Sequence, residues 1–276
     1  MFEKHDPVAH IAMRLSHGGH CYFMPNGGNL GDCLIASATI QAFEKARIPW
    51  SLIRGKRQSV RPSDLLVFGG GGSLVPLYEG GIQCIESLQK LGAPVVVLPQ
   101  TVRGNKEFWK QAEGITVFCR DFGSLDFIRK FPNIPSYLAD DMALRLDLTA
   151  DPFSTVAAFR DALSAEKKKR VLLAFRRDCE ALRPANEQSI DISALAHPAM
   201  ESVESIHANT CAFLAMLAGY SEIQTDRLHV AIGGSLLGIQ VRLHDNANSK
   251  NREVYETSLK ERFPSLRFVS EPAGKS

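Results

Sequence analysis

The segment TDRLH, at residues 225–229, combines side chains that could carry out acid–base chemistry on an anionic ligand. An arginine such as Arg227 can hold a carboxylate or a phosphate through two parallel hydrogen bonds, and a histidine such as His229 can exchange protons near neutral pH. A lone histidine is more often a satisfied structural group. Here the neighbouring Asp226 and Arg227, at the end of a predicted strand, favour a catalytic role for His229. Arg176, which follows another predicted strand in the segment FRRD, could hold the same anion.

Two glycine-rich segments suggest close approach of the backbone to a ligand. NGGNLGD (residues 26–32) lies between a predicted strand and a predicted helix, where free N–H groups suit an anion, and it points to Gly28 and Asn29. A tight connection capped by Asn29 or Asp32 would look the same. The four glycines at 69–72, including Gly71 and Gly72, cost folding entropy that a simple turn does not require, so close approach of a ligand or of another backbone segment is the better explanation.

Polar residues also follow the other predicted strands. Gln100 lies in LPQT, Arg120 in CRDFGS, and Asn246 and Lys250 lie in the stretch that closes a later strand. Together with Asp32, the residues Gln100, Asn246 and Lys250 are predicted to line the site or contact a second ligand. Because the carboxyl ends of parallel strands share one edge of a sheet, these residues are expected to converge.

The elements that must position these residues alternate between short apolar strands and amphipathic helices, which is typical of parallel α/β sheets. The first half predicts strands at Cys21–Met24, Leu65–Phe68, Val95–Leu98, Ile115–Cys119 and Tyr137–Ala139, with a further candidate at Trp50–Arg54. It predicts helices at Leu30–Lys45 and Ile82–Leu91. The second half predicts strands at Val171–Phe175, Glu222–Gln224, Ile239–Leu243 and Leu266–Val269, and helices at Phe153–Leu163, Ile206–Leu217, Leu228–Leu236 and Arg252–Arg262.

The pattern breaks near Asp147–Pro152, which predicts two Rossmann-like domains. Residues 1–150 would form an N-terminal domain with the glycine-rich loops, and residues 151–276 a C-terminal domain that carries TDRLH. The charged run Glu166–Arg170 is equally compatible with a solvated helix end before the next strand, so the boundary could move by ten residues or more.

Bulk composition is that of a folded globular protein, with 45% apolar and 22% charged residues among 276. The formal charge of +2 gives no reason to expect a nucleic-acid partner. Apolar runs are too short for a membrane span, so a cytoplasmic location is expected, with peripheral membrane association still open. The six cysteines are far apart and are expected to be reduced core residues. No metal site is expected.

The ordered motifs NGGNLGD, FGGGGS, LPQT, CRDFGS, FRRD, TDRLH and NSKN resemble the polysaccharide pyruvyltransferase family over roughly residues 21–251. The resemblance implies two Rossmann-like domains facing across a cleft, as in GT-B glycosyltransferases, with phosphoenolpyruvate bound in the cleft. In that family an Arg-Leu-His triplet and an arginine of the first domain contribute to the donor pocket. These match Arg227, Leu228, His229 and Arg120 here.

The activity implied by the resemblance is transfer of pyruvate from phosphoenolpyruvate to a sugar, an oligosaccharide or a lipid-linked glycan, with formation of a ketal. Phosphoenolpyruvate would be a co-substrate, and no cofactor is expected. His229 is the preferred general acid/base, with Arg227, Arg120 and Arg176 binding the anionic donor. The second half is compact compared with longer family members, which leaves the acceptor open.

Two alternatives remain at this stage. The first is a GT-B glycosyltransferase that uses a nucleotide sugar, for which Glu180 or Glu201 would have to grip the ribose. The second is a non-catalytic sugar-binding or scaffold protein of polysaccharide assembly. It would tolerate loss of Arg227 and His229.

Overall fold

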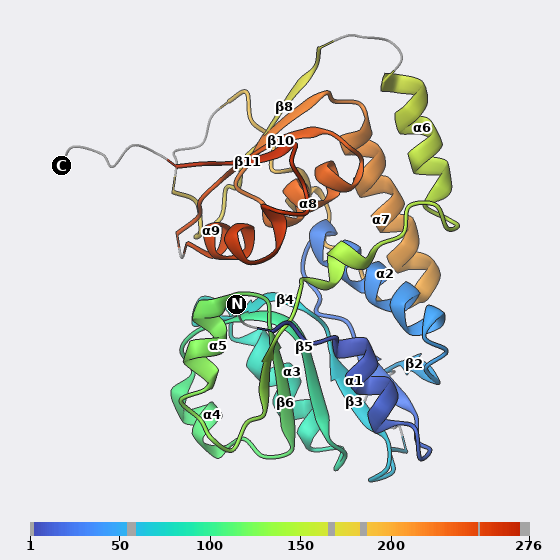
Figure 1. Ribbon diagram of the computed structural model, residues 1–276, viewed down its shortest axis with the longest axis vertical. Helices are drawn as coiled ribbons and strands as arrows, with labels where there is room; N and C mark the ends of the chain where they lie inside the picture. The colour runs from blue at the N-terminus through green and yellow to red at the C-terminus, as the bar shows by residue number, and fades with distance from the viewer. Residues whose placement is uncertain (1–2, 54–58, 165–168, 183–186, 248, 271–276) are drawn as a thin grey trace, which may run out of the picture. The chain divides into compact units, whose positions relative to one another are not determined.

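A computed structural model of the chain (Figure 1) describes residues 3–53, 59–164, 169–182, 187–247 and 249–270. The chain divides into two compact units. The first comprises Met1–Gly27, Ile35–Leu146 and Met200–Val203, and the second comprises Gly28–Leu34, Asp147–Ala199 and Glu204–Ser276. Each unit has helices around a parallel sheet, so both are mixed α/β and consistent with a Rossmann-like class.

The first unit is built on a seven-stranded sheet. Its strands are β1 (Cys21–Met24), β2 (Trp50–Leu52), β3 (Leu65–Phe68), β4 (Gly71–Leu74), β5 (Val95–Val102), β6 (Ile115–Cys119) and β7 (Ser136–Leu138). Their order is β2-β1-β3-β5-β6-β7, with β4 also paired to β5, and every pairing is parallel. The order reverses between β1 and β3, which is where sheets of this kind usually bind ligands.

Helices cover both faces of this sheet because alternate strand residues point to opposite sides. They are α1 (Pro7–Arg14), α2 (Leu30–Lys45), α3 (Gly80–Gln89), α4 (Lys106–Gln111) and α5 (Phe122–Ile128). Phe68 and Val97 belong to an apolar cluster that includes residues of α3, α4 and α5. On the other face, Phe23 meets Phe43 of α2 with ring centroids 5.6 Å apart.

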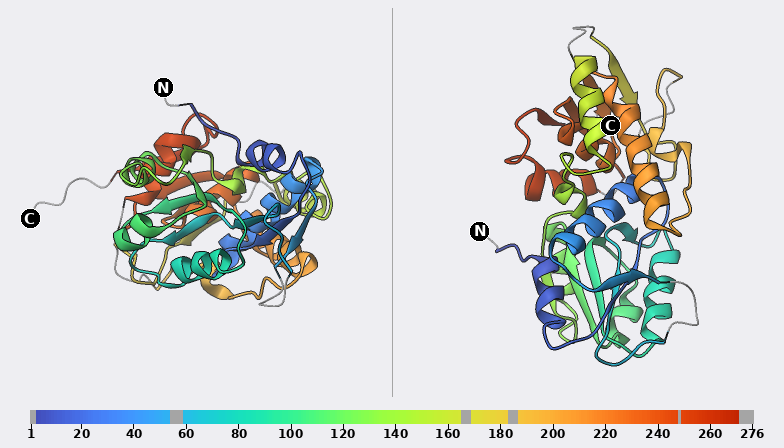
Figure 2. Two further views of the ribbon diagram at one scale, coloured as in Figure 1. Left: turned by 90° about the horizontal axis from the view of Figure 1, so that it is seen from below. Right: turned by 90° about the vertical axis from the view of Figure 1, so that its right-hand side faces the viewer.

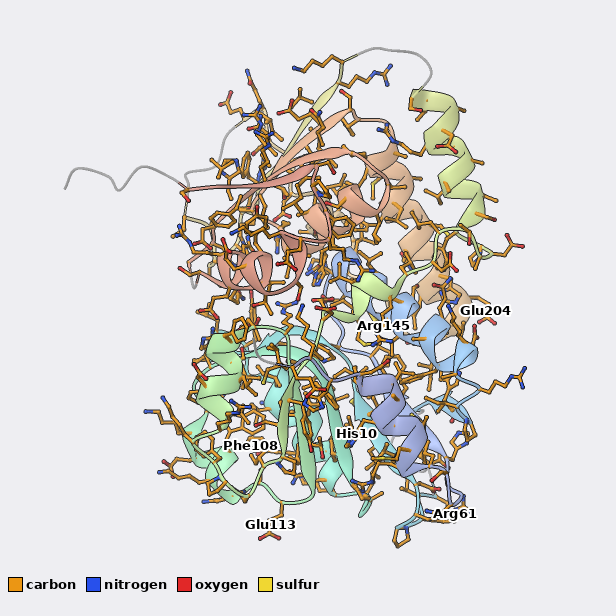
Figure 3. The ribbon with its side chains drawn as sticks, viewed as in Figure 1. His10, Arg61, Phe108, Glu113, Arg145 and Glu204 are labelled. Atoms are coloured by element: carbon orange, nitrogen blue, oxygen red, sulfur yellow. The ribbon has the colours of Figure 1, made fainter. Side chains whose placement is uncertain are left out.

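Helix α1 is fixed to the first unit at its start and along its length. Asp6 caps it by accepting a hydrogen bond from the N–H of Val8 at 2.8 Å, and the same carboxylate pairs with Arg145 at 2.8 Å. The ring of His10 meets Phe118 of β6 edge-on, with centroids 5.5 Å apart. Figure 3 labels both His10 and Arg145. This helix has no counterpart among the predicted elements.

The second unit is built on a four-stranded parallel sheet of order β11-β10-β9-β8. Its strands are β8 (Val171–Ala174), β9 (Glu222–Thr225), β10 (Gln240–His244) and β11 (Leu266–Val269). Its helices are α6 (Ser154–Ser164), α7 (Val203–Ala218), α8 (Leu228–Leu236) and α9 (Lys250–Val254), and a π-helical turn at Tyr255–Leu259 follows α9. Figure 2 shows α6 alongside α7. Arg160 of α6 donates to the carbonyl of Ala218 at 3.0 Å, which holds the two helices together.

Many predicted elements have the observed bounds, among them Cys21–Met24, Leu30–Lys45, Leu65–Phe68, Ile115–Cys119, Leu228–Leu236 and Leu266–Val269. Other elements differ by a few residues at their ends. The helix predicted at Arg252–Arg262 is present with shifted bounds: residues 250–254 are α-helical, and a π-helical turn at Tyr255–Leu259 continues them. Arg54, Asn248 and Glu166 belong to predicted segments but lie outside the described residues.

The glycine run at 69–72 was expected to form a loop, and this expectation is wrong for its second half. Gly71 and Gly72 begin strand β4, which pairs with β5. A Cβ atom on Gly69 would lie 2.5 Å from the main-chain nitrogen of Asn26, and one on Gly70 would lie 2.9 Å from the carbonyl oxygen of Pro99. The first two glycines therefore let neighbouring backbone segments pack closely, one of the two explanations considered for the run.

None of the helices in the described part of the chain combines the length and apolar character that a bilayer crossing requires. The cysteines are all free: Cys21, Cys33 and Cys119 are buried, whereas Cys179 is exposed. The expectation that the cysteines are core residues is therefore wrong for Cys179.

Candidate functional site

The carboxyl edge of the second sheet gathers the charged residues that the sequence analysis singled out in this unit. Strands β8, β9 and β10 are neighbours and run parallel, so the residues that follow them meet at one edge. Arg176 follows β8, Arg227 follows β9 and Asn246 follows β10. We call Arg176, Arg227 and Asn246, together with the side chains that contact them, the charged cluster.

Arg227 lies at the start of α8 and is bound by two carboxylates. Its Nε and Nη2 atoms donate to the two oxygens of Asp191 at 2.9 and 2.5 Å, and Nη2 lies 3.0 Å from Asp178 Oδ2. Its main-chain N–H donates to the hydroxyl of Thr225 at 3.0 Å. This two-pronged geometry is the one that guanidinium groups use to bind oxyanions.

Arg176 is bound in the same way from the neighbouring strand. Its Nε and Nη2 atoms donate to Asp178 at 2.7 and 3.0 Å, and its Nη1 atom donates to Glu180 at 2.5 Å. Partial burial alone would raise the pKa of Asp178. The hydrogen bonds and charge of Arg176 and the charge of Arg227 outweigh this effect and lower that pKa to about 2. Asp178 is therefore ionised at all ordinary pH values.

Glu180 joins Arg176 to the residues after β10. This carboxylate is buried and also accepts hydrogen bonds from Asn246 Nδ2 at 2.9 Å and from Lys250 Nζ. The structure thus brings the predicted site residues Asn246 and Lys250 into contact with Glu180. Contact of Asn246 and Lys250 with a ligand stays a prediction.

Asp226 directly precedes Arg227 in the chain and is almost completely buried. Its carboxylate accepts a hydrogen bond from the main-chain N–H of Arg176 at 2.8 Å. Burial raises the pKa of this carboxyl to about 6, although the hydrogen bond from Arg176 and the charges of Arg176 and Arg227 act in the opposite direction. Asp226 therefore titrates closer to neutrality than an ordinary aspartate.

His229 lies in the first turn of α8, two residues after Arg227, with the buried Leu228 between them. Gly31 belongs to the same compact unit and lies against it. A Cβ atom on Gly31 would lie 2.8 Å from His229 Cβ and 3.1 Å from His229 Nδ1. The NGGNLGD segment and the TDRLH segment therefore meet, and Gly31 leaves the space that the histidine occupies.

The rest of the NGGNLGD segment is tied together by its own side chains. The N–H of Gly31 donates to Asn29 Oδ1 at 2.8 Å, and the N–H of Asn29 donates to Asp32 Oδ2 at 2.8 Å. Asn29 and Asp32 thus act as caps for the start of α2, which the sequence analysis weighed as the alternative to ligand binding. Gly28 is exposed. Donor binding by Gly28 and Asn29 stays a prediction.

Two predicted site residues of the first unit, Arg120 and Gln100, lie near the carboxyl ends of β6 and β5, whereas Gly71 and Gly72 begin β4. Arg120, after β6, is buried and donates to Asp141 at 2.8 Å and to the hydroxyl of Thr101 at 3.0 Å. Gln100 is buried in β5 and donates to the carbonyl of Gly69 at 2.7 Å. A role of Arg120 in donor binding stays a prediction, and it would require the guanidinium to exchange or share its present acceptors.

Asp178, Glu180 and Asp191 were not predicted as donor- or acceptor-binding residues, although Glu180 was considered as a ribose contact for a nucleotide sugar. Asp178 and Glu180 could have been found, because they follow Arg176 by two and four residues in the same segment. Asp191 gives no such signal, because it precedes a short 3-10 helix at Ile192–Leu195 and does not follow a strand. Among the described residues, no group of histidine, cysteine, aspartate and glutamate side chains is arranged to hold a metal ion.

A hollow in the second unit is lined by Glu222, Gln240 and Arg242, among other residues. Its lining runs along the edge strand β11, from Glu222 and Gln240 at the starts of β9 and β10 to Val269 and Ser270 at the carboxyl end of β11. It contains none of the predicted site residues. We therefore place the candidate site at the charged cluster and not at this hollow.

The contact between Gly31 and His229 predicts that Gly31→Ala is destabilising. The added methyl group must displace the histidine or the helix start, at a cost of about 1–3 kcal/mol in the free energy of unfolding. Gly27→Ala is the matched control, because nothing lies within 4 Å of a Cβ atom there. Urea denaturation of both variants measures the difference. Equal stability of the two variants would show that Gly31 and His229 are not in contact.

The raised pKa of Asp226 predicts a pH-dependent loss of stability. Between about pH 4 and pH 6 the folded protein binds more protons at this carboxyl than the unfolded chain does, so the free energy of unfolding falls as the pH rises. Asp226→Asn keeps an acceptor for the N–H of Arg176 but removes the titration. Its stability relative to the wild type should rise by roughly 1–3 kcal/mol from pH 4 to pH 7 in urea denaturation. Parallel pH profiles for the two proteins would contradict the assignment.

Comparison with known proteins identifies the family. The sequence profile described as polysaccharide pyruvyl transferase matches residues 29–247, a range that includes the charged cluster and His229. A crystal structure of an uncharacterized protein from Klebsiella pneumoniae subsp. pneumoniae is 30% identical in sequence and superposes with a TM-score of 0.79, covering 97% of this chain and 100% of that one. Among curated proteins, no match was found. The chain belongs to the polysaccharide pyruvyl transferase family.

Proposed function

We propose that this protein transfers the pyruvyl group of phosphoenolpyruvate to a hydroxyl-bearing sugar of a polysaccharide or its precursor, forming a pyruvate ketal. The observation that carries the proposal is the charged cluster: two arginines at neighbouring strand ends, with a histidine in the first turn of the helix that follows. Family membership supports transfer of a pyruvyl group to a glycan. The donor and the ketal are inferred from what these side chains can do.

The donor carries a carboxylate and a phosphate, and both are oxyanions that guanidinium groups recognise. Arg176 and Arg227 supply such groups from adjacent strands, and neither can lose its charge at working pH. Because the two guanidinium groups share the carboxylate of Asp178, they lie close enough together to bind one small oxyanion between them. Arg120, from the first unit, is proposed as a further donor contact by analogy with the family.

His229 is the proposed general acid and base. In the first step it gives a proton to the methylene carbon of phosphoenolpyruvate, and the electrons of the double bond form the new C–H bond. A sugar hydroxyl then attacks the adjacent carbon and returns a proton to the histidine. Inorganic phosphate leaves with the bridging oxygen, and a second hydroxyl of the sugar attacks the same carbon. That hydroxyl proton leaves with the phosphate, so the products are one ketal and one phosphate.

The arginines would stabilise the charge that collects on the departing phosphate during this sequence. A GT-B-like arrangement of the two units, with the donor between them, belongs to the same proposal and is supported by the family resemblance. A cytoplasmic location and the use of phosphoenolpyruvate as a co-substrate, without any other cofactor, are also part of this proposal. Sugar, oligosaccharide and lipid-linked acceptors are all compatible with the chemistry.

The proposal predicts that the protein, incubated with phosphoenolpyruvate and candidate glycans, adds a pyruvyl group to a glycan and releases phosphate. His229→Ala should lower the rate about 10²- to 10⁴-fold, because the proton-transfer group is lost. Arg227→Lys should weaken donor binding, because a lysine keeps the charge but cannot form the two-pronged contact. Mass spectrometry of the glycan and a phosphate assay measure both effects.

Two matched variants control for changes in folding. His197 is exposed in the second unit, and Arg242 is exposed on β10, so His197→Ala and Arg242→Lys should retain the wild-type rate. All four variants are compared by thermal unfolding. Wild-type activity in a folded His229→Ala variant would reject the catalytic role of this histidine. Stabilisation of the protein by nucleotide sugars, but not by phosphoenolpyruvate, would favour a glycosyltransferase.

A further inference from the structure

Asp178 differs from the other carboxylates that bind the two arginines. Each arginine has one carboxylate that it does not share with the other arginine. Glu180 accepts from Nη1 of Arg176, and Asp191 accepts from Nε and Nη2 of Arg227. Asp178 is shared, because its oxygens contact Nε and Nη2 of Arg176 at 2.7 and 3.0 Å and Nη2 of Arg227 at 3.0 Å. It therefore lies where the two guanidinium groups meet.

Exposure separates Asp178 from these partners as well. Its side chain is 35% exposed, compared with 2% for Glu180 and 9% for Asp191. Removing a buried partner from a buried arginine would leave an uncompensated charge, whereas Asp178 can turn into water when another anion takes its position. Glu180 and Asp191 are thus fixed counterions, and Asp178 is the exchangeable one.

We propose that the carboxylate of Asp178 occupies the position in which an oxyanion of the donor binds. The carboxylate and the bound anion would therefore compete for Arg176 and Arg227. The proposal rests on the proposed function, and it names the group that a carboxylate or a phosphate must displace. With Asp178 in place, Arg176, Arg227 and Lys250 are already matched by Asp178, Glu180 and Asp191. An incoming anion is therefore repelled unless Asp178 leaves.

The local backbone shows how the side chain could be replaced without loss of the loop. Asp178 Oδ1 also accepts a hydrogen bond from the N–H of Glu180 at 3.1 Å. An asparagine can keep this bond through its side-chain oxygen while it removes the negative charge. Asp178→Asn is therefore the variant that tests the competition, because it changes the charge and leaves the turn in place.

The experiment is titration calorimetry of the full-length wild type and of Asp178→Asn with phosphoenolpyruvate, inorganic phosphate and pyruvate in turn. Loss of the competing charge should tighten binding of at least one of these anions about five- to tenfold, which is about 1–1.4 kcal/mol. Asp161→Asn makes the same change of charge on the exposed face of α6 and should leave binding unchanged. Comparison of phosphate with pyruvate shows whether the phosphate or the carboxylate of the donor binds at the position of Asp178.

Unchanged or weaker binding of all three anions by Asp178→Asn, relative to Asp161→Asn, would overturn the proposal, since a purely structural carboxylate holds the arginines in place. Absence of any anion binding by the wild type and by Asp178→Asn would overturn it too. Tighter binding of phosphate or pyruvate, but not of phosphoenolpyruvate, would support an anion-binding position at Asp178 and reject phosphoenolpyruvate as the donor. Asp178→Ala, which empties this position entirely, should show the same tightening if the asparagine variant does not fold.

Discussion

The pairing of Arg176 and Arg227 with carboxylates is the interaction on which the rest of the second unit's site depends. A guanidinium group keeps its charge, and burying that charge without a counterion costs several kcal/mol. The side chains of Arg176 and Arg227 are 7% and 11% exposed, and carboxylates contact both. These pairs fix the planes of the two guanidinium groups, so their orientation is set before any ligand arrives.

The parallel sheet explains why two arginines from distant parts of the sequence can share one counterion. Residues 176 and 227 are far apart in the chain, but β8 and β9 are neighbours and end at the same edge. The helix that follows β9 starts at once, so Arg227 caps its start and His229 lies in its first turn. Gly31 completes this arrangement because it has no side chain where the histidine packs.

The strand-end rule is the reason that the sequence predicted so much of the site. Arg176, Arg227, Asn246 and Lys250 were found because polar residues after parallel strands converge, and the structure brings all four into one network. Asp191 could not be found in this way, since it comes from an irregular segment.

Strand β4 was missed because glycine-rich sequence is typical of loops, and only its pairing with β5 makes it a strand. Helices α4 and α5 were missed because they are six and seven residues long, too short for a clear amphipathic period.

The central claim is that phosphoenolpyruvate gives its pyruvyl group to a sugar hydroxyl by cleavage of the bond between carbon and the bridging oxygen. The most direct test is transfer from phosphoenolpyruvate labelled with oxygen-18 at the bridging position, carried out in deuterated water. We predict that the label appears in the released phosphate and that the methyl group of the ketal contains one deuterium, both measured by mass spectrometry. Retention of the bridging label in the glycan product, or absence of solvent deuterium from its methyl group, would contradict the account.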